Sequence, residues 1–209
     1  MGNNLTPQWL LWAREIQALA QTSRFYAPDE FQRQRYVRLT EIAAEIVAAY
    51  TNLPLEPILQ AYETQDGYAT PKVGVRATVI QDDKLLMARE RDDGGWTLPG
   101  GWADVGDMPS EAVEREVWEE TGFQVKASRL IGVYDANCSP HPAPFQLYRL
   151  LFLCEITGGE ARPSNETSEV SFFGRDEIPF ELSPSRMETR YIDAAFDAFN
   201  KPDEPVHFD

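Results

Sequence analysis

The sequence contains little that would support a secreted, zinc-stabilised or membrane-spanning protein. Its 209 residues include two cysteines, Cys138 and Cys154, with no CxxC pair and no neighbouring histidine cluster. This argues against a disulfide framework and a structural zinc site. No apolar run approaches the ~18 residues of a membrane span, and the N-terminus lacks the basic-then-apolar pattern of a signal peptide. We therefore expect a cytoplasmic protein with no membrane partner.

Positive charge is also scarce. The chain has 19 Lys and Arg against 34 Asp and Glu, which gives a net charge of −15. Such a charge repels the backbone of nucleic acids and the surface of anionic membranes. An anionic substrate would therefore need local positive groups, either a few placed arginines or divalent cations.

The first part of the chain, from Pro7 to about Tyr62, has the apolar periodicity of helices. Asp29 is placed to cap the second helix, two prolines in "TNLPLEP" are placed to end it, and a third short helix is expected around Pro57–Tyr62. A polar linker with Gly and Pro follows at Glu63–Pro71. We expect a small all-α module at residues 1–65. The apolar positions at helical spacing are Trp9, Trp12, Ile16 and Leu19, then Tyr36, Leu39, Ala43, Ile46 and Tyr50.

The rest of the chain, residues 66–209, alternates strand-like and helical segments. "KVGVRATVI" is rich in β-branched residues, and "QDDK" turns it into "LLMARER", which predicts a hairpin. A glycine-rich loop and an acidic helix follow, and then further strands and a last helix. This order predicts an α/β sandwich with a mixed sheet. The acidic helix is expected at Pro109–Thr121, the further strands at Ser128–Ala136, Gln146–Thr157 and Val170–Gly174, and the last helix at Ser185–Phe199.

The acidic helix crowds like charges onto one face. Glu116, Glu119 and Glu120 stand at i, i+3 and i+4, an arrangement that is unfavourable unless positive charge lies among the carboxylates. Hard oxygen ligands of this kind suit Mg²⁺ or Mn²⁺, whereas the alternative on spacing alone is a solvated acidic face. Gly122 fits the end of the helix, and Asp107 is the residue we expect to cap its start.

The residues around this helix resemble the Nudix box, G-x5-E-x7-R-E-U-x-E-E-x-G-U, where U is a bulky apolar residue. One position departs from the pattern, because Asp107 replaces the first Glu. The matching positions are Gly101, Arg115, Glu116, Val117, Glu119, Glu120, Gly122 and Phe123.

The resemblance implies a Nudix fold, which is an α/β/α sandwich. It also implies divalent-metal-dependent cleavage of a nucleoside diphosphate linked to another moiety. It implies that Glu116 and Glu120 are the core metal ligands and that Glu119 is a further ligand. The carbonyl of Gly100 matches a backbone ligand, and Arg115 matches a residue that orients the glutamates by salt bridge. Mg²⁺ is the implied cofactor, with Mn²⁺ an alternative.

The general base of many Nudix enzymes is a Glu on a loop outside the box. "SNETSEVSFF" offers Glu166 and Glu169, and we favour Glu166 because it precedes the strand. Three arginines, Arg76, Arg89 and Arg91, could hold the phosphates, because a guanidinium binds phosphate oxygens bidentately. Arg186 and Arg190, at the start of the last helix, are further candidates.

The resemblance extends over nearly the whole chain to a bacterial Nudix subgroup with an N-terminal helical module. That subgroup includes CDP-choline pyrophosphatases and UDP-X diphosphatases, and relatives are often labelled ADP-ribose pyrophosphatases. It implies a homodimer formed through the module and a small nucleotide as substrate. Two alternatives are removal of pyrophosphate from an RNA 5′ end and a Nudix domain that senses a nucleotide without turnover. The nucleobase and the group on the far phosphate depend on loops such as Asp135–Phe145, which carry no readable code.

Overall fold

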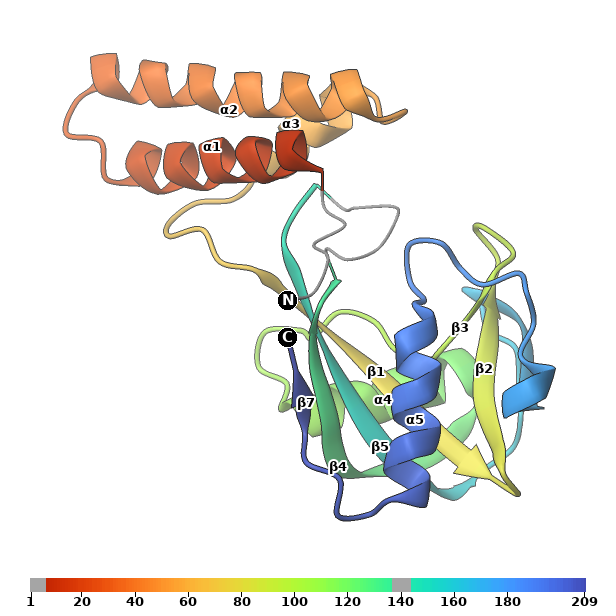
Figure 1. The fold of residues 1–209 in the computed structure, drawn as a ribbon. Coiled ribbons are helices and arrows are strands. Elements are labelled where there is room, and N and C mark those ends of the chain that lie inside the picture. Colours follow the sequence, from red (N-terminus) through yellow and green to blue (C-terminus); the bar gives the residue numbers. More distant parts are fainter. Residues whose placement is uncertain (1–6, 137–143) are drawn as a thin grey trace. The chain divides into compact units, whose positions relative to one another are not determined.

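The computed structural model describes residues 7–136 and 144–209, and the chain divides into two compact units (Figure 1). The first comprises Met1–Pro71 with Pro142–Gln146, and the second comprises Lys72–His141 with Leu147–Asp209. The expected boundary at residues 65 and 66 falls between the last helix of the first unit and the first strand of the second. Among the residues described, none of the helices combines the length and apolar character needed to cross a membrane.

The first unit holds three helices, α1 (Gln8–Phe25), α2 (Glu30–Tyr50) and α3 (Leu55–Glu63). Asp29 caps α2 as predicted, since its carboxylate accepts a hydrogen bond of 2.8 Å from the backbone N–H of Gln32. The third helix begins earlier than the predicted Pro57. Pro57 is tolerated in the first turn of α3 because the N–H groups of a first helical turn have no partner within the helix.

A small apolar core joins these helices and leaves part of α1 uncovered. The side chains of Trp12 and Leu19 are 57% and 61% exposed. They are seven residues apart, so they share one face of α1. The buried residues of this core are Leu10, Ala13, Ala43, Ala44, Val47, Ile58 and Tyr62.

The second unit is built on a mixed sheet with the strand order β3-β2-β1-β5-β4-β7, and β6 pairs with β2. β1 runs parallel to β5 and β4 parallel to β7, while the other pairs are antiparallel. The strands are β1 (Lys72–Gln81), β2 (Lys84–Glu90), β3 (Trp96–Thr97), β4 (Phe123–Asp135), β5 (Leu147–Gly159), β6 (Thr167–Gly174) and β7 (His207–Phe208).

Helices cover both faces of this sheet, as Figure 1 shows, with α5 (Thr189–Asn200) in front and α4 (Pro109–Thr121) behind. Val113 and Val117 of α4 pack with Val75 and other residues of one face. Tyr191 and Phe196 of α5 pack in a second core on the other face. The predicted α/β/α sandwich with a mixed sheet is thus confirmed.

The predicted hairpin is present, and its turn has a specific geometry. Asp82 and Asp83 have φ of 51° and 59°, the pair of positive values that a type I′ turn requires and that Asp tolerates. Such a turn matches the right-handed twist of β1 and β2, which pair across it at Gln81 and Lys84.

Several element bounds differ from the prediction. β4 begins at Phe123, directly after α4, and its pairing with β5 contains register shifts that blur the alternation of apolar residues. β6 begins at Thr167, and the short strands β3 and β7 carry no sequence pattern of their own. Cys154 is a buried free thiol, while Cys138 lies outside the described residues.

Candidate active site

A glycine loop runs beside β1 and faces α4. The carbonyls of Pro99 and Gly101 accept hydrogen bonds from the N–H groups of Ala77 and Val75 at 2.8 and 2.9 Å. Gly100 has φ of +143°, and a Cβ there would strike the Val75 carbonyl, whereas a Cβ on Gly101 would strike the carboxylate of Glu116. Gly100 therefore needs glycine, whereas a side chain at position 101 would require Glu116 to turn. Within the described ranges the Gly100 carbonyl accepts no hydrogen bond.

The acidic helix α4 spans Pro109–Thr121 as predicted, and Gly122 ends it with φ of +79°. The predicted cap is wrong: Met108 occupies the N-cap position and no side chain caps the helix. Asp107 instead lies 3.1 Å from Arg115. An ion pair with a residue two turns along the helix thus takes the carboxylate that capping would have used.

Arg115 lies among four carboxylates and offsets their repulsion. Its Nη1 is 2.8 Å from Glu116 and 3.2 Å from Glu119, and its Nη2 is 3.3 Å from Asp104 and 3.1 Å from Asp107. Glu116 is mostly shielded from solvent and Glu119 is half exposed. The positive charge expected between the acids of this helix is therefore supplied in part by the chain itself.

Glu120 is the buried member of the acidic face, at 3% exposure. Its Oε2 accepts a hydrogen bond of 2.8 Å from the N–H of Gly100, while its Oε1 is buried without a hydrogen bond. Burial raises the pKa of this carboxyl to about 7, against the opposing effects of Arg76 and the Gly100 N–H. One oxygen of Glu120 therefore needs a positive partner.

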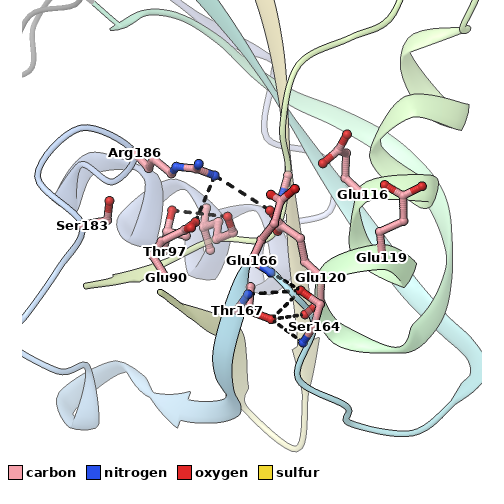
Figure 2. Close-up of polar contacts among 12 residues, drawn as sticks. Glu90, Thr97, Glu116, Glu119, Glu120, Ser164, Glu166, Thr167, Ser183 and Arg186 are labelled. Carbon is pink, nitrogen blue, oxygen red and sulfur yellow. Dashed lines mark hydrogen bonds and ion pairs between the residues drawn. The ribbon is translucent and has the colours of Figure 1, made fainter. Parts of the chain in front are cut away.

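Glu90, which sequence analysis did not assign, and Arg186, which it named only as a further phosphate candidate, complete this cluster. Glu90, at the end of β2, is 2% exposed, and burial raises its pKa. Arg186 reaches across both acids (Figure 2), with its Nη1 3.1 Å from Glu90 Oε1 and 4.0 Å from Glu120 Oε1. The sequence signal for Glu90 is a carboxylate at the end of the strand-forming segment "KLLMARE", which lies outside the Nudix box.

The loop that precedes β6 is fastened to α4. The hydroxyl of Thr167 donates a hydrogen bond of 2.6 Å to the main-chain carbonyl of Glu120. Glu166 is the residue before it, and Figure 2 labels it together with Glu120 and Thr167. Its carboxylate is exposed and makes no hydrogen bond or ion pair to the described part of the chain, whereas Glu169 pairs with Arg89 at 2.7 Å.

The three arginines proposed as phosphate contacts lie in different environments. Arg76 is 6% exposed, and burial together with the neighbouring Arg149 lowers its pKa to about 10. The Nε of Arg89 donates to the Gly94 carbonyl at 2.8 Å. Arg91 donates from Nε to the Ser164 carbonyl at 3.1 Å, within the loop that carries Glu166. Arg76 is thus buried near Glu120, while Arg89 and Arg91 contact the chain on either side of Glu166.

The residues of α4 and the glycine loop fit a hard divalent cation. All the donors are oxygens, one oxygen of Glu120 is buried without a hydrogen bond, and the Gly100 carbonyl is available. Across residues 7–136 and 144–209, no three His, Cys, Asp or Glu side chains are gathered as a ligand set. Arg115 holds Glu116 and Glu119, so binding a cation at all three glutamates requires these side chains to turn from the arginine.

Comparison with known proteins agrees with this geometry. Residues 70–195 match the NUDIX domain, and residues 7–62 match a UDP-X-like, N-terminal oligomerisation domain. The protein YjhB of Bacillus subtilis (strain 168) is 35% identical over 203 residues, which are 97% of each chain.

Two solved structures are similar. The crystal structure of a UDP-X diphosphatase is 28% identical, with a TM-score of 0.63 over 96% of this chain and 98% of that one. The crystal structure of an ADP-ribose pyrophosphatase from Streptococcus suis 89-1591 is 33% identical, with a TM-score of 0.61 over 67% of this chain and all of that one. With the glycine loop and the acidic helix in register, the chain belongs to the Nudix hydrolase family and is a Nudix pyrophosphohydrolase.

Proposed function

We propose that this enzyme hydrolyses the pyrophosphate bond of a nucleoside diphosphate linked to another moiety, with Mg²⁺ or Mn²⁺ as cofactor. The observation that carries the proposal is the placement of Glu120. Its carboxylate is buried against the glycine loop with one oxygen lacking a hydrogen bond. Burying a carboxylate costs several kcal/mol unless a cation compensates it.

Glu116, Glu120 and the Gly100 carbonyl would hold the cation, with Glu119 as a further ligand. Divalent cations bound there would neutralise the phosphates and lower the pKa of a bound water. Arg115, which lies among the carboxylates in their present arrangement, would orient Glu116 and Glu119. Arg89 and Arg91 remain proposed contacts of the substrate phosphates, while Arg76 is better placed to balance the charge of Glu120.

Glu166 is the proposed general base. The attacking water must lose a proton, and a carboxylate that is not engaged in an ion pair can accept it. Glu166 meets this requirement. It directly precedes Thr167, whose hydroxyl is hydrogen-bonded to the main-chain carbonyl of Glu120. Glu169, the other candidate, shares its charge with Arg89.

The names of the relatives suggest the substrate class. YjhB carries the provisional name ADP-ribose pyrophosphatase, and the two solved structures are called a UDP-X diphosphatase and an ADP-ribose pyrophosphatase. YjhB and the UDP-X diphosphatase are similar to this chain over nearly its whole length. We therefore propose ADP-ribose or a UDP-linked compound as the substrate, with CDP-choline a third candidate that rests on the sequence resemblance.

A substrate panel tests this function. The full chain is incubated with ADP-ribose, UDP-glucose, CDP-choline and a 5′-triphosphorylated RNA, each with Mg²⁺, Mn²⁺ or excess EDTA. Anion-exchange chromatography then resolves each nucleoside monophosphate from its parent compound, and released pyrophosphate from the triphosphorylated RNA. We expect turnover of at least one nucleoside diphosphate compound and its loss in EDTA.

The panel also separates the alternatives. Preferred turnover of the RNA would indicate a 5′-pyrophosphohydrolase, which the net charge of −15 disfavours for long RNA. Binding of a nucleotide without turnover of any substrate would indicate a sensor domain and would refute the proposed hydrolysis.

We propose further that the helical unit forms a homodimer. The match to an oligomerisation domain supports self-association, and the exposed Trp12 and Leu19 on one face of α1 are suited to an apolar interface. The unit keeps its own core without them, so these two side chains can be changed without removing buried packing.

The double variant Trp12→Glu/Leu19→Glu is expected to be monomeric, because it places two charges in the proposed interface. Light scattering after size-exclusion chromatography measures the mass, with the wild type expected at two chains. Gln34→Glu, which adds a negative charge at an exposed position of α2 and not on this face of α1, is the control and should stay dimeric. A double variant that keeps the mass of two chains and the helical circular-dichroism signal would move the interface elsewhere.

A further inference from the structure

Glu90 is a buried glutamate outside the Nudix box. Its backbone is fixed on both sides, since its N–H donates to the Gly95 carbonyl at 2.9 Å and its position pairs with Thr167 of β6. Its side chain is 2% exposed, and its Oε1 makes no hydrogen bond. An isolated carboxylate in such a place is strongly unfavourable. Its charge partner therefore identifies its role.

That partner is Arg186, whose guanidinium also approaches Glu120. The distances from Nη1 are 3.1 Å to Glu90 and 4.0 Å to Glu120, as drawn in Figure 2. The two acids are enclosed, with side-chain exposures of 3% and 4%, whereas the Arg186 side chain is 33% exposed. Arg186 is thus the member of this group that a ligand at the surface can reach.

The backbone of Arg186 is held in place by a second arginine, Arg149, which is buried. Arg149 of β5 donates from Nη1 to the carbonyl of Arg186 at 2.8 Å and from Nη2 to the carbonyl of Ser185 at 2.6 Å. The segment is also closed by a hydrogen bond of 3.0 Å from Met187 to Ser183. The guanidinium of Arg186 itself donates no hydrogen bond of good geometry to the described residues, so its N–H groups are available.

We propose that Arg186 binds a phosphate oxygen of the substrate and that Glu90 is a positioning residue that holds the guanidinium beside the metal ligand Glu120. The inference rests on the proposed function. A fixed, partly exposed guanidinium with free N–H groups is suited to a phosphate. Glu90 is too enclosed to touch a ligand, so it acts through Arg186. Once a cation neutralises Glu120, Arg186 remains paired with Glu90 alone and presents its other N–H groups outward.

Variants of the full chain test this assignment with three measurements. Calorimetry measures Mn²⁺ binding to the metal-free protein, and binding of α,β-methylene-ADP in the presence of Mn²⁺ needs no turnover. Steady-state kinetics on a substrate from the panel gives KM and kcat. The variants are Arg186→Gln, Arg186→Lys, Glu90→Gln and the double variant Glu90→Gln/Arg186→Gln, and the control is Arg175→Gln, whose side chain pairs with Asp193 at an exposed site.

Arg186→Gln is expected to raise KM and weaken the analogue about 10- to 100-fold, the range for a hydrogen bond to a charged group. Mn²⁺ binding should be unchanged or tighter, because a cation that competes for Glu120 is gone. Arg186→Lys keeps the charge beside Glu90 and should fold normally, but it lacks the planar fork and should also raise KM. Glu90→Gln should reproduce part of the KM effect, and the double variant should be no worse than Arg186→Gln, since the two residues act as a unit.

Each contrary result is decisive. Analogue affinity within twofold of wild type in Arg186→Gln and Arg186→Lys would refute the phosphate contact. Mn²⁺ binding weakened more than about fivefold by Glu90→Gln would make Glu90 a metal ligand and refute its positioning role. A wild type that binds the analogue but turns over no substrate would refute the proposed hydrolysis. Comparison of analogue affinities between wild type and the Arg186 variants would then still test the phosphate contact. Arg175→Gln should match wild type in every measurement.

Discussion

Glu120→Gln is expected to lower kcat about a thousandfold with the fold intact. The amide has nearly the volume of the carboxylate and can still accept the hydrogen bond of 2.8 Å from Gly100. What it loses is the charge of a proposed metal ligand. Stabilisation of the transition state by a bound cation is worth several kcal/mol, and about 4 kcal/mol corresponds to about a thousandfold in rate. Steady-state kinetics with saturating Mg²⁺ measures the loss.

Glu111→Gln is the matched control, because Glu111 lies exposed in the first turn of the same helix. It should keep kcat near wild type and lose at most a fraction of a kcal/mol of helix-dipole stabilisation. Glu120→Gln with kcat within tenfold of wild type would remove Glu120 from the metal site.

The pH dependence of stability provides an independent check on Glu120. Its pKa is raised from 4.5 to about 7 in the folded protein, so between these values the folded state binds more protons than the unfolded state. The free energy of unfolding of the metal-free protein should therefore fall as the pH rises through this window. In Glu120→Gln this fall should be smaller. It should not vanish, because the pKa values of Glu90 and Glu116 are also raised and both residues remain in the variant. Thermal unfolding at a series of pH values in EDTA measures the difference.

The bounds of α4 could be predicted because both signals act locally. Pro109 suits a first helical turn, where its missing N–H is not needed, and Gly122 adopts the positive φ that ends the helix. Asp107 could not be placed by the same reasoning. Its capping propensity is local, but its partner Arg115 also contacts three other acids, and this network determines where the carboxylate points.

The start of α5 shows the same limit over a longer range. Sequence periodicity predicts Ser185, whereas the helix begins at Thr189. The intervening carbonyls of Ser185 and Arg186 accept hydrogen bonds from Arg149, a residue of β5. Such a contact depends on the tertiary fold, and no local pattern announces it. The pairing of Arg186 with Glu90 and Glu120 could not be predicted for the same reason.

Glu114, on the same helix, has a role that the sequence does not show. Its carboxylate accepts a hydrogen bond of 2.9 Å from the N–H of Ala127 in β4 and lies 3.1 Å from Lys126. The acidic helix therefore uses its carboxylates in at least two ways. Glu114 joins the helix to the sheet, while Glu116, Glu119 and Glu120 form the proposed metal face. Spacing alone could not divide them, because the register of β4 against α4 is a tertiary property.

Glu166→Gln is expected to lower kcat by about 10²- to 10⁴-fold with little change in KM, the effect typical of losing a general base. The carboxylate makes no ion pair or hydrogen bond to the described residues, so the amide disturbs no contact there, and the loop stays fastened through Thr167 and Glu120. Steady-state kinetics with saturating Mg²⁺ measures both constants.

Glu169→Gln is the comparison that makes this result interpretable. Both acids lie within the same segment and both are exposed, but Glu169 is held by Arg89 at 2.7 Å. Loss of an exposed ion pair costs at most about 1 kcal/mol of stability, and kcat should stay within about threefold of wild type. If Glu169→Gln is the inactive variant and Glu166→Gln the active one, then Glu169 must leave Arg89 when substrate binds, and the base is Glu169. If both variants keep kcat within about threefold of wild type, the proton passes to a group outside this loop.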